Sequence, residues 1–150
     1  MKVVIRPLRS EHWPELIDLW VVTWQQAMPQ IDFEWRREWL KGYLPELEAK
    51  GFELMGAFGD KDTVMGFIAI NPQTQILDQI AVAVGAKGKG VASALMQVAR
   101  EHSPSGIILN VNVDNARAIH FYEKQGFHKT GITGLSPRSK LPFLEMMWPL

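Results

Sequence analysis

The chain has 150 residues, of which 47% are hydrophobic and 21% are charged, a composition typical of one soluble globular domain over residues 1–150. Its 16 Lys and Arg residues balance its 16 Asp and Glu residues, no basic cluster with interleaved aromatic residues indicates nucleic-acid binding, and no apolar run is long enough to span a membrane. The chain has no cysteine, only scattered histidines and no signal peptide, so thiolate chemistry is excluded, a metal site is disfavoured and a cytoplasmic location is expected.

Hydrophobic periodicity predicts the order strand, helix, helix, strand, strand, strand, helix, strand, helix, strand, strand. The expected strands are Val3–Pro7, Phe52–Phe58, Val64–Ile70, Gln75–Val84, Ile107–Val113, one near residue 130 and Leu144–Trp148. The expected helices are one that begins after a cap at Ser10, one over Phe33–Leu47 with Asp32 as its cap, Ala92–Glu101 and Ala116–Gln125. This order predicts a mixed α/β domain.

A glycine-rich turn links the expected strand that ends near Val84 to the helix that follows it. Residues 85–90, Gly-Ala-Lys-Gly-Lys-Gly, would expose backbone N–H groups at a helix N-terminus, where they and the helix dipole favour an anion such as a pyrophosphate. A nucleotide P-loop is disfavoured because Val91 and Ala92 stand where Lys and Ser or Thr are needed. A dinucleotide fingerprint is disfavoured because Ser93 replaces its last glycine. A flexible basic surface loop stays an alternative at this point.

The segment after residue 107 combines a strand with a capped helix. Apolar residues alternate with Asn110 and Asn112, so one face of the strand is expected to be apolar and the other polar. Asn115 can cap the following helix. Gly126 can end that helix in a left-handed conformation, with Phe127 packing back on it as in a Schellman motif. Each of these features has a purely structural explanation.

Together the two segments resemble the GNAT superfamily of N-acetyltransferases. Residues 87–92 resemble its pyrophosphate loop, Gln/Arg-x-x-Gly-x-Gly/Ala, and residues 115–127 resemble its signature, Asn-x-x-Ala-Ile/Val-x-Phe/Leu-Tyr-x-x-x-Gly-Phe. The matching positions are Gly90, Ala92, Asn115, Ala118, Ile119, Phe121, Tyr122, Gly126 and Phe127. Lys87 departs from the pattern, because lysine keeps the charge of arginine but lacks its planar set of donors.

The resemblance implies a mixed central sheet, flanked by helices, in which two parallel strands splay apart. Acetyl-CoA would lie in the gap between residues 75–84 and 107–113, with its pantetheine beside the backbone of Ile80 and Val82. Its pyrophosphate would accept hydrogen bonds from the glycine loop, and Asn115 would bond the ligand, cap the helix, or do both. The positions that the resemblance assigns to acetyl-CoA are Ile80, Ala81, Val82, Lys87, Gly88, Lys89, Gly90, Val91, Ala92, Asn115 and Tyr122.

Tyr122 and one carboxylate are the expected catalytic residues. The resemblance assigns to Tyr122 the role of general acid, which donates to the departing CoA thiolate or hydrogen-bonds its sulfur. Packing on the buried face of its helix is the structural alternative. The attacking amine must lose a proton, and Asp78 is the first candidate to accept it. Glu53, also a candidate contact of the acceptor, is the second, and ordered water without a dedicated base is an alternative to both.

The first two helices are expected to supply the acceptor site. Their aromatic residues are Trp20, Trp24, Phe33, Trp35 and Trp39, and most of these are expected to pack in the core. Trp24 and Phe33 flank a helix break at Met28 and are the expected acceptor contacts. Residues 1–85 contain 8 Lys and Arg against 12 Asp and Glu, and residues 86–150 contain 8 against 4, so an acidic half suits a cationic acceptor and a basic half suits a polyanion.

The expected function is acetyl transfer from acetyl-CoA to a primary amine of a small molecule or a peptide, by direct attack. An acetyl-CoA-binding sensor or interaction module with little turnover is the alternative. Tyr122 argues against the sensor, because a pure binder needs no acid beside the sulfur. Transfer of a longer acyl group is a third possibility. No metal is expected as a cofactor, and a homodimer stays open.

Overall fold

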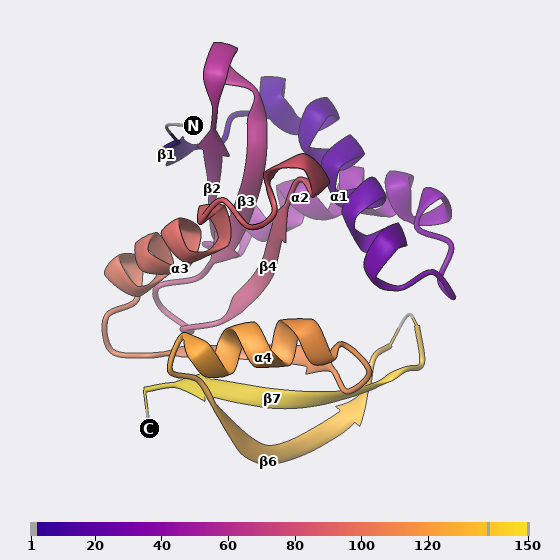
Figure 1. Ribbon diagram of the computed structural model, residues 1–150, viewed down its shortest axis with the longest axis vertical. Coiled ribbons are helices and arrows are strands. Elements are labelled where there is room, and N and C mark those ends of the chain that lie inside the picture. Colours follow the sequence, from indigo (N-terminus) through magenta and orange to yellow (C-terminus); the bar gives the residue numbers. More distant parts are fainter. Residues whose placement is uncertain (1–2, 138, 150) are drawn as a thin grey trace.

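Two antiparallel sheets form the framework of the molecule (Figure 1). The computed structural model describes residues 3–137 and 139–149. The first sheet has the strand order β1-β2-β3-β4, with β1 at Val4–Pro7, β2 at Glu53–Phe58, β3 at Val64–Ile70 and β4 at Leu77–Val82. The second sheet has the order β5-β7-β6, with β5 at Ile107–Asn112, β6 at His128–Leu135 and β7 at Pro142–Trp148.

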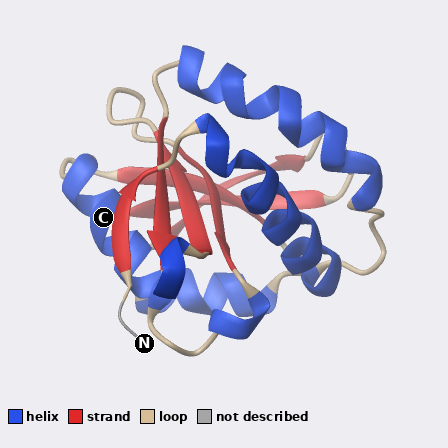
Figure 2. Ribbon diagram, turned by 90° about the horizontal axis from the view of Figure 1, so that it is seen from above, coloured by secondary structure: helices blue, strands red, loops and turns tan. Residues whose placement is uncertain are grey.

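Helices cover both faces of the first sheet (Figure 1, Figure 2). The α-helices are α1 at Trp13–Ala27, α2 at Arg37–Ala49, α3 at Val91–His102 and α4 at Ala116–Lys124, and the 3-10 turns are η1 at Ser10–His12, η2 at Glu34–Arg36, η3 at Asp60–Asp62 and η4 at Val84–Ala86. Side chains alternate along β3, so Phe67 packs in the core with α1 and α2 whereas Ile68 packs in the core with α3 and α4. None of the described helices is long and apolar enough to cross a membrane.

The strands β4 and β5 run parallel but meet only at one end. Ile76 and Ile108 form a parallel bridge, and the Ile108 N–H donates to the carbonyl of Gln75 at 2.8 Å. Beyond this bridge the described strands form no ladder with each other, so β4 and β5 part toward their C-terminal ends. Ligands of open α/β sheets bind at the carboxyl ends of strands that part in this way.

The α/β class, the order of the elements and the splayed parallel strands are confirmed. The expected mixed sheet divides into two antiparallel sheets, because the only parallel pairing of the described residues is the single bridge. The expected cap at Ser10 is wrong. The chain forms the turn η1 there, with Arg9 at the cap position and its N–H donating to His12 Nδ1 at 3.0 Å. Asp32 is not the N-cap either, since Phe33 holds that position in η2 and Arg36 holds it in α2, but its Oδ1 accepts the N–H of Glu34 at 3.1 Å just before the turn η2.

Candidate active site

The loop between η4 and α3 presents backbone N–H groups to one end of the gap. Gly88 and Gly90 adopt φ values of +78 and +79, which L side chains rarely adopt, and Gly90 is the N-cap of α3. The first helical bond of α3 runs from the Ala94 N–H to the Gly90 carbonyl at 3.0 Å. In the described chain the N–H groups of both glycines and of residues 91–93 therefore have no acceptor. They are available to an anion.

The outer edge of β4 offers further backbone groups along the gap. The Ala83 N–H donates to the Met65 carbonyl on β3 at 2.8 Å. Because backbone groups alternate sides along an antiparallel strand, Ile80 and Val82 turn their N–H and C=O groups away from β3. Thr23 on α1 confirms this direction, since its hydroxyl donates to the Val82 carbonyl at 3.1 Å. An extended ligand can pair with this edge as an added strand would.

The motif that ends α4 fixes the position of Tyr122. Gly126 has a φ of +93, and its N–H donates to the Glu123 carbonyl at 3.0 Å. The Phe127 N–H donates to the Tyr122 carbonyl at 3.0 Å, which completes the expected Schellman motif. The ring of Phe127 then packs on Tyr122, with 5.7 Å between the ring centroids. The Gly-Phe pair of the signature thus holds the tyrosine in place.

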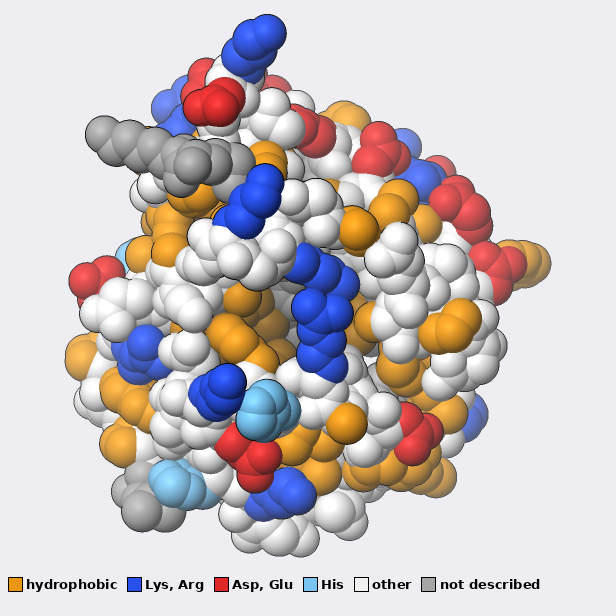
Figure 3. Space-filling model, viewed as in Figure 1, with side chains coloured by type: hydrophobic (Ala, Val, Ile, Leu, Met, Phe, Trp, Pro, Cys, Tyr) orange, Lys and Arg blue, Asp and Glu red, His pale blue; other side chains and the backbone are white. Residues whose placement is uncertain are grey.

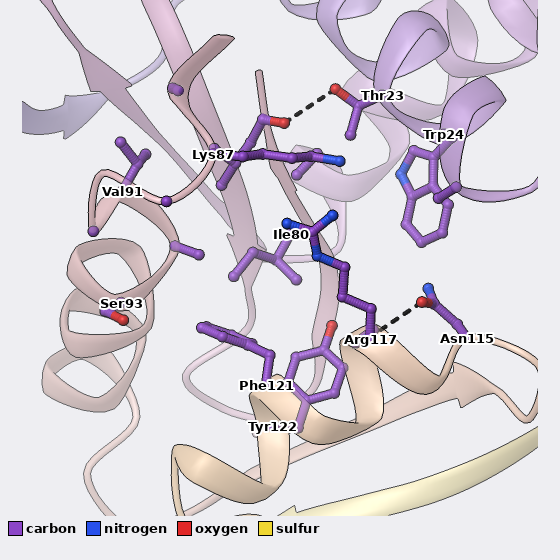
Figure 4. A pocket seen from close by; sticks show the side chains of 18 residues that line it. Thr23, Trp24, Ile80, Lys87, Val91, Ser93, Asn115, Arg117, Phe121 and Tyr122 are labelled. Carbon is purple, nitrogen blue, oxygen red and sulfur yellow. Dashed lines mark hydrogen bonds between the residues drawn. The ribbon is translucent and has the colours of Figure 1, made fainter. Parts of the chain in front are cut away.

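Tyr122 points its hydroxyl into the gap between β4 and α4 (Figure 4). The side chain is only 8% exposed, and its hydroxyl has no hydrogen-bond partner among the residues that the structure describes. Burial raises the pKa of the Tyr122 phenol well above its ordinary value. The phenol is therefore neutral at physiological pH and has a proton to offer in a hydrogen bond.

Two cations, Lys87 and Arg117, share the cavity with Tyr122. The cavity has a volume of about 350 Å³ and is also lined by Ile80, Ala81, Val82, Gly88, Gly90, Val91 and Ala92. Figure 3 shows Lys and Arg side chains beside an apolar hollow on this face of the molecule. Burial and the charge of Arg117 lower the pKa of the Lys87 ammonium below its usual range. Two like charges at one cavity indicate a place for a polyanion.

Asn115 combines a structural contact with a second polar group at the cavity. Its Oδ1 accepts the Ala118 N–H at 3.2 Å, which makes it the expected N-cap of α4. Its Nδ2 takes no part in this cap and lies on the side of Asn115 that faces Trp24 (Figure 4). The structure thus confirms the helix cap and leaves the amide donor beside the cavity.

Two smaller cavities continue from this one toward α1 and α2. One has about 180 Å³ and lies between β4, β5 and α4, and the other has about 260 Å³ and lies against the aromatic residues of α1 and α2. The rings that line the larger of the two are Trp20, Trp24, Phe33, Trp39 and Tyr43. Trp24 and Phe33 thus lie at this site together, with 6.1 Å between their ring centroids. Trp35 does not pack in the core, because the turn η2 leaves it 85% exposed.

Asp78 lies in the wall shared by these two smaller cavities. Its Oδ1 accepts the Tyr43 hydroxyl at 2.8 Å, and its Oδ2 accepts the Gln79 amide at 3.2 Å. Gln79 is held in turn by the indole N–H of Trp20 at 3.1 Å. The carboxylate is therefore oriented by neutral donors, and it is the only carboxylate that lines any of the three connected cavities in the described chain.

Two expected site residues lie elsewhere. Glu53 on β2 is paired with His102 at the end of α3, beside a separate cavity under β1 and β2, so the structure does not bring it to the acceptor. Its position follows from the sheet order and register, since Glu53 pairs with Ile70 and Ile70 with Leu77, which places Glu53 level with the acceptor side but two strands away from the gap. Lys89 is exposed and does not line the cavity, and its N–H donates to the Ala86 carbonyl at 3.3 Å. The described residues include no cluster of three or more His, Asp or Glu side chains that could hold a metal.

Several lining residues were not anticipated. Arg117 could have been found from the sequence, because it is a positive charge two residues after the cap Asn115. Asn110 and Asn112 could have been found from the alternation of polar and apolar residues along their strand. Ser136 comes from the connection between β6 and β7, where no pattern in the sequence marks it. Residues from segments this far apart in the sequence become neighbours only when the chain folds, so no local pattern predicts their contact.

The splayed strands, the anion-binding loop and the buried tyrosine are features of one enzyme class. A family model described as "Acetyltransferase (GNAT) family" matches residues 6–127, which is most of the chain. The chain therefore belongs to the GNAT acetyltransferase family. It is an N-acetyltransferase.

Individual relatives cover nearly the whole chain. The peptidyl-lysine N-acetyltransferase YjaB of Salmonella typhimurium is 28% identical over 99% of this chain and 100% of its own. The solution structure of apo YjaB from Escherichia coli, 27% identical, superposes with a TM-score of 0.80 over 99% of this chain and 98% of that one. The PaiA N-acetyltransferase of Thermoplasma acidophilum, solved in complex with coenzyme A, is 21% identical with a TM-score of 0.77 over 97% and 98%, and it shows the shared fold.

Proposed function

We propose that this enzyme transfers the acetyl group of acetyl-CoA to the side-chain amine of a lysine in a peptide or protein. The observation that carries the proposal is the continuous path through the gap. It runs from the free N–H groups of the glycine loop, past the Tyr122 hydroxyl, to a carboxylate among aromatic rings. A polyanionic donor suits one end of this path and a cationic acceptor suits the other.

The donor end supports acetyl-CoA through its residues. The N–H groups of Gly88, Gly90 and residues 91–93 are suited to the pyrophosphate, and Lys87 and Arg117 supply the positive charge. The outward backbone groups of β4 at Ile80 suit the amides of the pantetheine, which would then run along the strand toward Tyr122. The cavity of about 350 Å³ is of the size that holds a small-molecule group, such as the acetyl end and part of the pantetheine.

Tyr122 would act on the sulfur as a hydrogen-bond donor. Its raised pKa keeps the phenol protonated, so it does not serve as a base. A thiol has a pKa near 8.5, well below that of this phenol, so a hydrogen bond to the departing thiolate is favoured over complete proton transfer. Such a bond strengthens as negative charge develops on the sulfur, and it therefore stabilises the transition state more than the ground state.

The acceptor end supports a lysine side chain. The ring faces of Trp24, Trp39 and Tyr43 suit a methylene chain that ends in an ammonium, and Asp78 offers the only carboxylate of the connected cavities in the described chain. Asp78 would bind the ammonium and accept its proton, directly or through water, before the neutral amine attacks. The relative YjaB carries the name peptidyl-lysine N-acetyltransferase, which agrees with this choice of acceptor.

The test is release of free CoA thiol from acetyl-CoA against a panel of amines. Lysine-containing peptides should give the largest kcat/KM, ahead of N-terminal amines, polyamines, aminoglycosides and free amino acids, and mass spectrometry should find the acetyl group on the lysine side chain. Faster turnover of a small amine than of every peptide would overturn the acceptor assignment. Tight binding of acetyl-CoA without thiol release across the panel would instead favour the sensor.

A further inference from the structure

Trp24 occupies a position that no other described residue shares. It lines the donor cavity and both acceptor cavities, whereas Tyr122 and Asn115 line two of the three and Asp78 lines the two on the acceptor side. The acetyl group must pass from donor to acceptor where these cavities meet. The indole of Trp24 therefore lies beside the place of reaction.

The indole N–H of Trp24 is a buried donor without an acceptor. Its Nε1 is shielded from water and has no hydrogen-bond partner among the described residues, whereas the indole of Trp20 one turn earlier donates to Gln79 at 3.1 Å. In Figure 4 the nitrogen lies on the edge of the ring that faces the cavity. Buried donors are nearly always paired, so one that is unpaired at the junction of three cavities suggests a partner that arrives with a ligand.

The chemistry of the indole limits what that partner can be. An indole N–H donates and does not accept, so it cannot bind the ammonium of the acceptor. Stacking on Phe33, with an interplanar angle of 26°, fixes the direction of the ring. At the point where the donor cavity opens toward Asp78, the acceptor atom that an acetyl thioester brings is its carbonyl oxygen.

We infer that the Trp24 indole N–H donates a hydrogen bond to the carbonyl oxygen of the acetyl group during transfer. This inference rests on the proposed use of acetyl-CoA. The lone pair of the amine forms the new C–N bond while the carbonyl π pair moves to oxygen. When this pair returns, the C–S bond breaks and its electrons leave on the sulfur that Tyr122 hydrogen-bonds. Asp78 already holds the proton taken from the ammonium, so the proton that the nitrogen loses after attack passes to water. A preorganised donor on the oxygen that gains charge lowers the barrier.

The kinetic test compares two tryptophans with the same unpaired N–H. Trp13 Nε1 is also buried without a partner, but Trp13 lines none of the three cavities, so Trp13→Phe is a matched control. Trp24→Phe keeps an aromatic ring beside Phe33 and removes the donor together with part of the indole ring, a loss of size that Trp13→Phe shares. It should lower kcat by about 10- to 100-fold with the Kd of acetyl-CoA nearly unchanged, and Trp13→Phe should leave kcat at the wild-type value. An unchanged kcat in Trp24→Phe, or an equal fall in both variants, would overturn the inference.

A binding measurement tests the same contact without turnover. In 15N-labelled protein, the indole cross-peak that is missing from Trp24→Phe identifies the Trp24 N–H. Acetyl-CoA, which carries the carbonyl, should move this peak downfield further than CoA does. Equal shifts with both ligands would mean that the partner is not the acetyl carbonyl and would overturn the inference alone. A larger shift with acetyl-CoA than with CoA, without turnover of any amine, would support the inference although the proposed function failed. If neither acetyl-CoA nor CoA binds, both the inference and the proposed function are overturned.

Discussion

The donor end and the acceptor end of the gap are built in different ways. The donor end uses backbone N–H groups of one loop and one strand edge, with Tyr122 added from a helix whose end is fixed by its own motif. The acceptor end uses side chains from α1, α2, β4, β5 and the connection between β6 and β7. Backbone groups bind any ligand of the right shape, whereas a set of converging side chains selects a particular one. We therefore expect the donor end to be common to the family and the acceptor end to determine which amine this enzyme uses.

The two ends also differ in charge. Lys87 and Arg117 make the donor cavity positive, and Asp78 places a single carboxylate among aromatic rings at the other end. If this division is real, a substitution at the donor end should change the affinity for acetyl-CoA, and one at the acceptor end should change the kinetics of the amine. Tyr122 is the exception at the donor end, because its hydroxyl would act on charge that develops only in the transition state, so its substitution should change turnover alone.

The largest effect is expected from Tyr122→Phe. Loss of the hydroxyl removes the donor to the departing sulfur, so kcat should fall by about 100-fold. The Kd of acetyl-CoA, measured by calorimetry, should stay within about twofold, because the hydroxyl acts on charge that develops only in the transition state. The hydroxyl has no partner among the described residues, so the melting temperature should not fall. Wild-type turnover in this variant would remove Tyr122 from the mechanism.

The next largest effect is expected at the glycine loop. Gly90→Val places a β-branched residue at a φ of +79, so the start of α3 must distort and the N–H cradle with it. We expect the Kd of acetyl-CoA to rise by about tenfold or more, a loss of about 1.4 kcal/mol of binding free energy. Gly85→Ala is the control, because Gly85 has no positive φ and a Cβ there meets open space. If Gly90→Val binds acetyl-CoA as the wild type does, the loop does not hold the pyrophosphate.

The contrast between the two ends also explains what could be predicted from the sequence. The strand, the turn, the helix start and the Schellman end of α4 are local features, so residue types at fixed spacings predict them. Gly90, Asn115 and Tyr122, which the two motifs single out, line one cavity. The missed Ser10 cap shows the limit even here, because Arg9 and His12 offered a competing local hydrogen bond.

The acceptor end was less predictable because its residues are adjacent only in space. Trp24 and Phe33 followed from the break between two helices, but the contact between Tyr43 and Asp78 joins residues 35 positions apart. The charge of Glu53 in a hairpin makes it a candidate, but the register of β2 places it beside His102 instead. Nothing local in the sequence distinguishes Asp78 from Glu53, since both are single carboxylates on strands.

A smaller effect is expected from Asp78→Asn. The amide preserves the size of the side chain and an acceptor for Tyr43, but it removes the charge and the base. We expect kcat/KM for a lysine peptide to fall by about tenfold and the acidic limb of its pH profile to flatten, with the Kd of acetyl-CoA unchanged. Tyr43→Phe is the matched comparison, because it removes the hydrogen bond and leaves the carboxylate, so the acidic limb should persist. An acidic limb that persists in Asp78→Asn would assign the proton to ordered water.

The smallest effect is expected from the pH dependence of acetyl-CoA binding at Lys87. Its lowered pKa means that the ammonium loses its charge at a lower pH than an ordinary lysine does, so affinity is highest below that pKa and falls as the pH rises through it. Acetyl-CoA has no thiol to titrate, and the wild-type Kd should rise about two- to threefold between neutral pH and the ordinary lysine pKa of about 10.4. Lys87→Arg should abolish this rise because a guanidinium stays charged, whereas Lys89→Arg, in the same loop but outside the cavity, should retain it. A flat wild-type profile would mean that Lys87 contributes its stem and not its charge, and the positive potential of the donor end would then come from Arg117.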